Sequence, residues 1–188
     1  MTINQILAEL AHGLARLSIS YAVMGGQAVL LHGEPRMTRD IDLTLGVDTT
    51  RLPDLLRLAE ESGWRVLVAN PEEFVTRHLV LPCEDAGSGV RLDLIFGLSP
   101  FERGAIARAQ AVEIEGAPVR FVTVEDLLIM KLVAGRPRDL EDARGLVRKH
   151  PGFERAYVLG WLEQYDRDLG LETVAHLRGM TVRGSAGA

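Results

Sequence analysis

The sequence predicts an α+β or α/β protein in which a sheet domain carries an all-helical C-terminal extension. Helical and strand patterns alternate up to about residue 122, and only helical patterns follow. The chain has 188 residues, 47% hydrophobic and 25% charged, as expected of an ordinary globular protein with one domain. No flexible stretch lies near residue 122. We therefore expect a sheet domain at 1–122 and a helical subdomain at 123–188, packed into a single compact unit.

The elements of the sheet domain follow from hydrophobic spacing and from turn residues. In the first helix, one stripe of apolar side chains recurs at helical spacing. The pair Gly25-Gly26 breaks the chain after the first strand, and Gly33 with Pro35 ends the next helix. In order, we expect a helix at 2–17, a strand at 21–24, a helix at 27–32, a strand at 40–46, a helix at 51–62 and strands at 64–69, 76–82 and 90–96.

The rest of the chain is mostly helical. A helix near 100–109 and short strands at 110–115 and 118–122 complete the sheet domain, and helices follow at 123–134, 139–149 and 153–169. In the first of these, Val124, Leu127, Lys131 and Ala134 form one stripe, so Lys131 lies on or beside the face expected to be buried. Its ammonium either reaches solvent along the aliphatic stem or is directed at a phosphate.

Composition and charge exclude several classes of protein. The net charge of -5 argues against binding to nucleic acid through the overall field of the protein. No apolar run approaches the 18 or so residues of a membrane span, and the N-terminus lacks the pattern of a signal peptide. Because Cys83 is the only cysteine, an intrachain disulfide and a cysteine-based zinc site are excluded. The histidines have no metal-ligand spacing. We expect a cytoplasmic, bacterial-type protein without a membrane partner.

Three aspartates are the strongest functional signal. On an expected strand, Asp40 and Asp42 share one face while Ile41 and Leu43 share the other. Two neighbouring carboxylates repel unless a cation or a proton lies between them, and Mg²⁺ prefers such oxygen ligands. Taken alone, such a pair is more often two exposed acids at the end of an edge strand than a metal site. Asp93 adds a third carboxylate amid the apolar residues of another expected strand.

The glycine pair adds a site for phosphate. Gly25 and Gly26 stand between a strand and a helix, where glycine permits positive φ and close backbone approach. The N–H groups at the start of the helix are available to a phosphate. A glycine pair is by itself often a plain turn. Together with the three acids it supplies what in-line phosphoryl or nucleotidyl transfer needs, a phosphate cradle and ligands for two magnesium ions.

This set of residues resembles the nucleotidyltransferase superfamily related to DNA polymerase β. The pattern of that superfamily is a hydrophobic residue with Gly-Gly or Gly-Ser, nine to thirteen residues, Asp-h-Asp/Glu-h (h, hydrophobic), and a third acid on a later strand. Here thirteen residues separate Gly26 from Asp40. Gly26 stands where better-known members have Ser, so any phosphate grip rests on backbone N–H groups.

Within the superfamily, residues 20–148 are similar to AbiEii-type toxin nucleotidyltransferases and their small uncharacterised relatives. The segments that carry the likeness are Gly-Gly-Gln-Ala-Val-Leu-Leu-His at 25–32, Arg-Met-Thr-Arg-Asp-Ile-Asp-Leu at 36–43, Thr-Val-Glu-Asp-Leu-Leu-Ile-Met-Lys-Leu at 123–132 and Arg-Pro-Arg-Asp-Leu-Glu-Asp at 136–142. The resemblance implies an α+β fold, a nucleotidyltransferase-type mixed sheet flanked by helices with a helical extension.

The resemblance also implies an activity, namely metal-dependent transfer of a nucleotide from an NTP to a hydroxyl acceptor. Mg²⁺, or Mn²⁺ in its place, would be held by Asp40, Asp42 and Asp93, with Asp93 also activating the attacking hydroxyl. The expected catalytic residues are these three and Lys131. The residues expected to bind nucleotide and phosphate are Gly25, Gly26, Gln27, Arg39 and Lys131.

The resemblance further suggests a biological role for the protein, and two alternative functions stay open. The protein would be the toxin-like partner of a toxin–antitoxin or defence pair, acting on tRNA or a protein, with a cognate antitoxin. One rival is transfer to a small hydroxylated molecule such as an aminoglycoside. Another is a non-catalytic member that binds a nucleotide or a protein partner.

Two further aspartates, Asp139 and Asp142, start the next expected helix. Asp139 is readily explained as an N-cap, with Asp142 completing a capping box. In the toxin-like relatives an Asp in this segment accompanies the lysine, and either residue could be that Asp. Arg136 adds positive charge beside them, suited to phosphate or to a tRNA-like substrate.

Overall fold

The computed structural model describes residues 1–182, and their side chains through residue 180. The chain divides into two compact units, Met1–Gln27 with Met37–Val122, and Ala28–Arg36 with the chain from Thr123 onward. Residues 28–36, which the sequence analysis assigned to the sheet domain, thus belong with the helical unit. The expectation that the two units pack as one stays a prediction.

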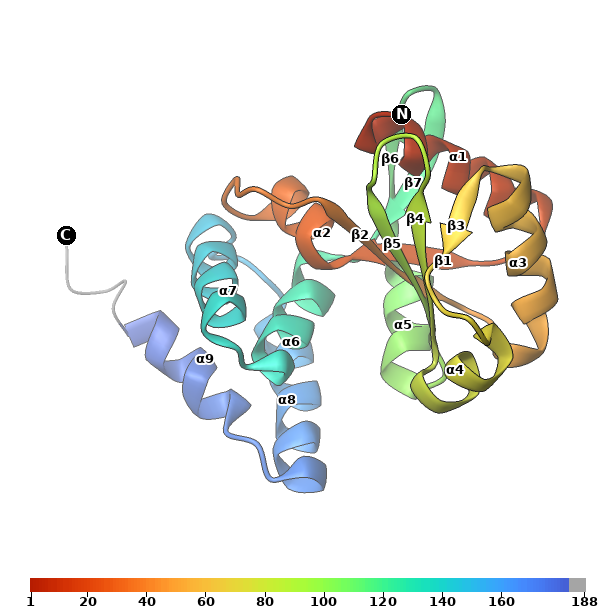
Figure 1. Ribbon diagram of the computed structural model, residues 1–188. Helices are drawn as coiled ribbons and strands as arrows, with labels where there is room; N and C mark the ends of the chain where they lie inside the picture. The colour runs from red at the N-terminus through yellow and green to blue at the C-terminus, as the bar shows by residue number, and fades with distance from the viewer. Residues whose placement is uncertain (183–188) are drawn as a thin grey trace. The chain divides into compact units, whose positions relative to one another are not determined.

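The first unit is built on a mixed sheet of seven strands in the order β3-β4-β5-β2-β1-β7-β6. Figure 1 shows the long strands β2, β4 and β5 in the middle of this unit. The strands are β1 (Tyr21–Met24), β2 (Asp40–Leu45), β3 (Trp64–Val66), β4 (Val80–Asp85), β5 (Arg91–Phe96), β6 (Gln110–Ile114) and β7 (Ala117–Phe121).

The central strand β2 pairs antiparallel with β1 and parallel with β5. Side chains on β2 and β5 alternate between a buried face and a more open one. Ile41 and Leu43 lie in register with Leu92 and Leu94, and all four side chains are completely buried. The polar residues of both strands therefore share the opposite face, as strand periodicity requires.

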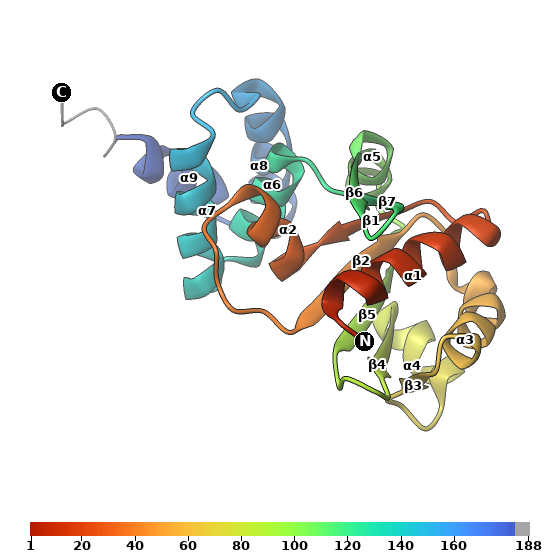
Figure 2. The ribbon, with the colours of Figure 1, turned by 90° about the horizontal axis from the view of Figure 1, so that it is seen from above.

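Helices cover this sheet on two sides. They are α1 (Ile3–Arg16), the short 3-10 helix η1 (Thr49–Arg51), α3 (Leu52–Glu61), α4 (Pro71–His78) and α5 (Pro100–Arg108). The predicted stripe of α1 is buried, and Gly13 lets the helix approach Leu58 of α3 so closely that a side chain there would collide. Figure 2 shows α1 and α3 along one side of the sheet and α5 on the other.

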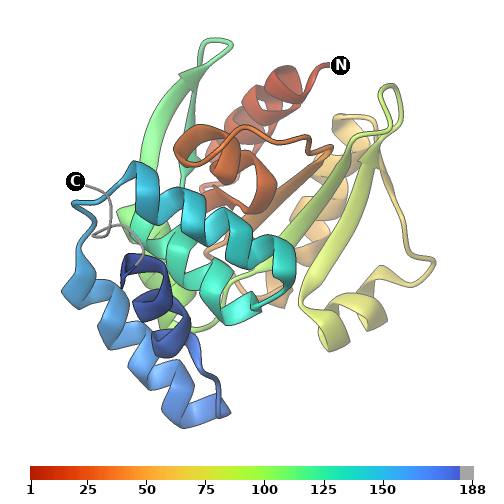
Figure 3. The same ribbon diagram turned by 90° about the vertical axis from the view of Figure 1, so that its left-hand side faces the viewer.

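The second unit is all helical and begins with the end of α2 (Gly25–His32), which starts in the first unit. Its further helices are α6 (Val124–Ala134), α7 (Pro137–Lys149), α8 (Arg155–Leu169) and α9 (Thr173–Val182), seen side by side in Figure 3. Their core contains Leu128, Leu132, Leu146 and Leu162, each at most 1% exposed. An α+β fold with a helical C-terminal part is thus confirmed.

The structure differs from the expected elements in three places, at a strand, at a helix start and at an additional helix. The strand expected at 76–82 is instead the end of α4 followed by β4. Asn70 caps α4 through its side chain, Pro71 occupies its first turn, and Leu79 ends it in the left-handed conformation. These end signals assign residues up to 78 to the helix, and the strand begins only at Val80.

The other two differences concern a helix start and an additional helix. The glycine pair forms the first residues of α2 rather than a break before it. The helix expected to be the last, at 153–169, is followed by α9, which the sequence analysis missed. The large apolar residues of α9, Val174, Leu177 and Met180, alternate with polar and small ones, so its sequence carries only a weak helical pattern. Within residues 1–182, no helix combines the length and the apolar character that a membrane crossing requires.

Candidate active site

The glycine pair lies directly against the acidic strand. Gly25 has φ +60°, in the left-handed region, and a Cβ there would overlap the carboxylate of Asp42. A Cβ on Gly26 would overlap the hydroxyl of Thr38. Both positions thus demand glycine because the backbone at the start of α2 touches side chains next to and on β2. The first N–H groups of α2 are consequently close to a carboxylate, the arrangement expected of a phosphate and metal site.

The three predicted carboxylates share one face of the sheet. Asp42 and Asp93 are direct partners in the parallel pairing of β2 with β5, which places their backbones about 4.8 Å apart. Asp40 lies two residues earlier on the same face of β2, in register with Arg91. Asp42 and Asp93 are half-buried, whereas Asp40 is exposed. The fold thus brings together two acids that lie 51 positions apart in the sequence.

The electrostatics of this face favour a cation. Burial raises the pKa of Asp93; Arg91 opposes that rise and the negative charge of Asp40 adds to it. Within residues 1–182, no three His, Cys, Asp or Glu side chains are grouped closely enough to hold a metal ion as they stand. The donor chemistry of these side chains, carboxylate oxygens, is the one that Mg²⁺ prefers.

Gln27 and Arg39 have different surroundings. Gln27 is 6% exposed, and its amide Nε2 donates a hydrogen bond of 3.1 Å to the backbone carbonyl of Asp40. This side chain therefore ties the start of α2 to the start of β2, a function that the sequence analysis did not foresee. Arg39, immediately before β2, is exposed. Its expected contact with the nucleotide stays a prediction.

Lys131 lies in the second unit in a buried ion cluster. Its side chain is 8% exposed, and Nζ lies 2.8 Å from Asp139 Oδ1 and 2.8 Å from Asp142 Oδ2. The ammonium is thus enclosed between two carboxylates and does not reach solvent along its stem. Arg136 donates to Asp139 from its Nε. Burial would raise the pKa of Asp139, but hydrogen bonds from Arg136 and Lys131 outweigh it and hold this pKa below its usual value.

The same cluster corrects one interpretation and adds one residue. Asp139 is not the N-cap of α7, because the helix begins at Pro137 with Arg136 in the capping position and without a side-chain cap. The sequence analysis also missed Arg36, whose guanidinium donates two hydrogen bonds to Asp142, of 3.0 and 3.2 Å. The available signal was its position at the start of the segment 36–43 that carries the resemblance.

A comparison with protein families decides the classification. The model of the family described as "Nucleotidyltransferase of unknown function (DUF6036)" matches residues 1–148. The chain belongs to this nucleotidyltransferase family. No curated protein matches its sequence.

Solved structures agree with this nucleotidyltransferase assignment at the level of the fold. The antibiotic-resistance factor ANT(2'')-Ia is 16% identical with a TM-score of 0.62, over 87% of this chain and 91% of that one. An antigenic nucleotidyltransferase-like protein from Paracoccidioides brasiliensis is 22% identical with a TM-score of 0.57, over 93% and 91%. The lincosamide antibiotic adenylyltransferase LnuA, bound to lincomycin, is 16% identical with a TM-score of 0.54, over 78% and 96%.

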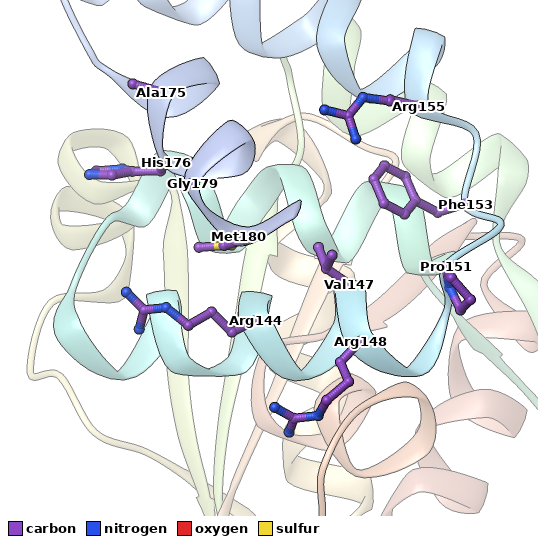
Figure 4. A pocket seen from close by; sticks show the side chains of 10 residues that line it. All are labelled: Arg144, Val147, Arg148, Pro151, Phe153, Arg155, Ala175, His176, Gly179 and Met180. Carbon is purple, nitrogen blue, oxygen red and sulfur yellow. The ribbon is translucent and has the colours of Figure 1, made fainter. Parts of the chain in front are cut away.

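The helical unit of this nucleotidyltransferase also carries a surface pocket of about 920 Å³. Figure 4 shows Arg144 and Arg148 on α7, with His176 and Met180 of α9 across from them and Arg155 beside Phe153. None of the residues that line this pocket, all within the described part of the chain, is acidic. Arg148 pairs with Glu34 at 3.0 Å, and both side chains are largely exposed. The pocket is therefore a basic surface with an aromatic wall.

Proposed function

We propose that this protein catalyses the Mg²⁺-dependent transfer of a nucleotide from an NTP to a hydroxyl group, acting in the cytoplasm as the toxin-like partner of a bacterial toxin–antitoxin or defence pair. The observation that carries the transferase reaction is the register of Asp42 with Asp93 beside a glycine pair that admits no side chain. The toxin role is supported by the resemblance of residues 20–148 to AbiEii-type nucleotidyltransferases.

The residues of the first unit would divide the work as follows. The N–H groups of Gly25 and Gly26 would bind phosphate oxygens of the NTP. Asp42, Asp93 and, after a change of rotamer, Asp40 would hold Mg²⁺. When bound, Mg²⁺, or Mn²⁺ in its place, neutralises charge on the triphosphate and orients it for in-line attack. Gln27 would keep the two halves of the site together through its bond to the carbonyl of Asp40.

In the transfer step, the acceptor hydroxyl oxygen forms a bond to the α-phosphorus and pyrophosphate leaves with the bridging oxygen. Asp93, on the strand next to Asp42, would take the proton of the hydroxyl. A positioned base of this kind contributes about 10²–10⁴-fold to a rate.

Lys131 would contribute positive charge toward the phosphates. The ion cluster around it contains three cations, Lys131, Arg36 and Arg136, and two anions, Asp139 and Asp142. This surplus of one positive charge would attract a polyphosphate even while Lys131 stays paired. Arg39, exposed beside β2, would add a further contact to the nucleotide.

The pocket of the helical unit supports an acceptor that carries phosphates. Arginines together with an aromatic side chain are the groups that bind an RNA backbone and stack on its bases. Arg144, Arg148 and Arg155 with Phe153 supply these groups. We therefore propose tRNA as the acceptor ahead of a protein, and a cognate antitoxin as the partner that restrains the activity.

The test is a labelling reaction with four separate NTPs, each labelled on the α-phosphate, in the presence of Mg²⁺. Total RNA, total protein or no acceptor is supplied in parallel, and Asp42→Asn serves as the inactive control. Label in small RNA with the wild type and none with Asp42→Asn supports the proposal. Label in protein would support the transferase activity and would replace tRNA by a protein as the acceptor. No label with any NTP and acceptor contradicts the transferase reaction.

A small-molecule acceptor is the second candidate function. The observation in its favour is the fold shared with ANT(2'')-Ia, solved in complex with adenylyl-2''-tobramycin, and with LnuA. An aminoglycoside is polycationic, so it would suit the acidic face of the first unit in a chain of net charge -5. Adding tobramycin or lincomycin to the labelling reaction separates the candidates, because the labelled product is then a small molecule. A protein that binds NTP without transferring label to anything would be the non-catalytic alternative.

A further inference from the structure

Helix α7 holds the segment that leads into the acidic strand. This segment follows α2 and has no helix or strand of its own from residue 34 to residue 39. Two contacts tie this segment to α7, and two more tie the residues just before it to the end of that helix. They are Arg36 with Asp142 at 3.0 Å, Glu34 with Arg148 at 3.0 Å, the carbonyl of Gly33 with Lys149 Nζ at 3.0 Å and the carbonyl of His32 with His150 Nε2 at 2.7 Å.

These four contacts differ in strength. The pair of Glu34 with Arg148 is exposed on both sides, and such surface pairs contribute little. The pair of Arg36 with Asp142 is bidentate, the Asp142 side chain is only 6% exposed, and Arg36 is 21% exposed. A two-point charge-assisted bond in a shielded place fixes both the position and the orientation of the guanidinium. It is therefore the contact that holds the segment most firmly.

Beyond Arg36, every second residue of the chain is placed against the glycine pair or the start of α2. Thr38 lies against Gly26, the carbonyl of Asp40 accepts from Gln27, and the carboxylate of Asp42 lies against Gly25. Only Met37 separates Arg36 from Thr38. The covalent chain thus transmits the position of Arg36 to the residues proposed to hold the metal.

We infer that Arg36 is a positioning residue, which α7 holds through Asp142 so that the backbone of residues 37–42 presents Asp40 and Asp42 to the metal and the NTP. The inference rests on the proposed function for its effect on activity, although not for its effect on the backbone.

The first test is hydrogen–deuterium exchange of Arg36→Met, Arg36→Lys and the matched control Arg148→Met, without ligands. Asp142 keeps Lys131 as a partner in Arg36→Met, so this variant should fold. We expect exchange in residues 37–43 to become at least tenfold faster in Arg36→Met, with α6 and α7 unchanged. Arg36→Lys, which keeps a point charge without the second bond, should lie between the two. Arg148→Met should match the wild type.

The second test is the Mg²⁺ dependence of the labelling reaction. We expect the Mg²⁺ concentration for half-maximal rate to rise at least tenfold in Arg36→Met and to stay unchanged in Glu34→Gln, which breaks the exposed pair with Arg148 and leaves the arginines of the pocket in place. Unchanged exchange in residues 37–43 of Arg36→Met would overturn the inference. Faster exchange throughout α6 and α7 would also overturn it, because it would mean that the pair of Arg36 with Asp142 only stabilises the helices. If the wild type transfers no label, the proposed function fails, while the exchange experiment still decides the inference.

Discussion

Two groups of aspartates in this protein have surroundings that shift the pKa of a carboxyl group in opposite directions. In the first unit, Asp93 lies in register with Asp42. Its pKa is raised by burial, with Arg91 opposing the rise and the charge of Asp40 adding to it. In the second unit, Asp139 is paired with Lys131 and Arg136, and its pKa is lowered. The first group is therefore suited to bind a cation from solution, whereas the second has its cations supplied by the chain.

This difference distinguishes acids proposed to bind a metal ion from acids that are paired with cationic side chains of the protein itself. Buried charges are costly unless they are paired, so a fold either completes the pairing or leaves it to a ligand. Asp139 and Asp142, at most 8% exposed, share three cationic side chains. Among the acids on β2 and β5, Asp40 lies in register with Arg91. Each group can be perturbed separately, and the effects should differ in kind.

The largest effect should follow from removing a carboxylate of the first unit. Asp42→Asn keeps the size of the side chain and removes one proposed ligand of Mg²⁺. Because metal stabilisation of the transition state is worth several kcal/mol, we expect nucleotidyl transfer to fall by about 10³-fold or more. Initial rates of label transfer measure this, and the melting temperature should show that the variant is folded. A variant with more than a tenth of the wild-type rate would remove Asp42 from the site.

The next effect concerns the second unit and should be one of stability. Lys131→Met removes the cation shared by Asp139 and Asp142. Breaking a buried ion pair by removing one partner costs about 3–5 kcal/mol, and the remaining arginines should keep the loss near the lower end. Urea denaturation measures it. Lys149→Met, which affects the only other lysine, is the matched control and should lose less, because its Nζ donates a single hydrogen bond, to the carbonyl of Gly33, and neutralises no buried carboxylate. Equal losses in both variants would contradict the assigned cluster.

A smaller effect of opposite sign is expected for Asp93→Asn without metal. The pKa of Asp93 is raised in the folded protein, so its ionisation destabilises the fold. This cost is absent below the pKa of the unfolded chain and grows as pH rises through the raised value. We expect Asp93→Asn to be more stable than the wild type at pH 7 and equal to it near pH 3. Melting curves across pH measure the difference, and saturating Mg²⁺ should reverse it.

The smallest effect should come from the thiol beside the acids. Burial, with a further contribution from Asp93, raises the pKa of Cys83 to about 12. Its thiolate fraction at neutral pH is then roughly 10³-fold below that of a free cysteine. We expect a thiol reagent to label the native protein very slowly and the unfolded protein at once. Cys83→Ser should transfer label at the wild-type rate, and a folded but inactive variant would mean that the thiol takes part in the reaction.

The sequence predicted much of this fold because its signals are local. The stripe of α1, the alternation of β2 and the expected strand containing Asp93 are patterns in neighbouring residues, and each element formed. The prediction failed at α4, whose end signals assign residues up to 78 to a helix. The missed helix α9 has only a weak helical pattern and is held by packing against α6, α7 and α8.

The sequence by itself determined which chemical groups are present, namely two carboxylates on one strand face, a glycine pair and a third acid. Their order and spacing follow a pattern shared with nucleotidyltransferases. Tertiary structure alone decided which charges meet. Asp93 joins Asp42 through strand pairing, Arg36 meets Asp142 across 106 positions, and Lys131 is enclosed by two aspartates. The physical reason is that strand and helix periodicity assign a side chain to a face, whereas its partner depends on which distant segment the fold packs against that face.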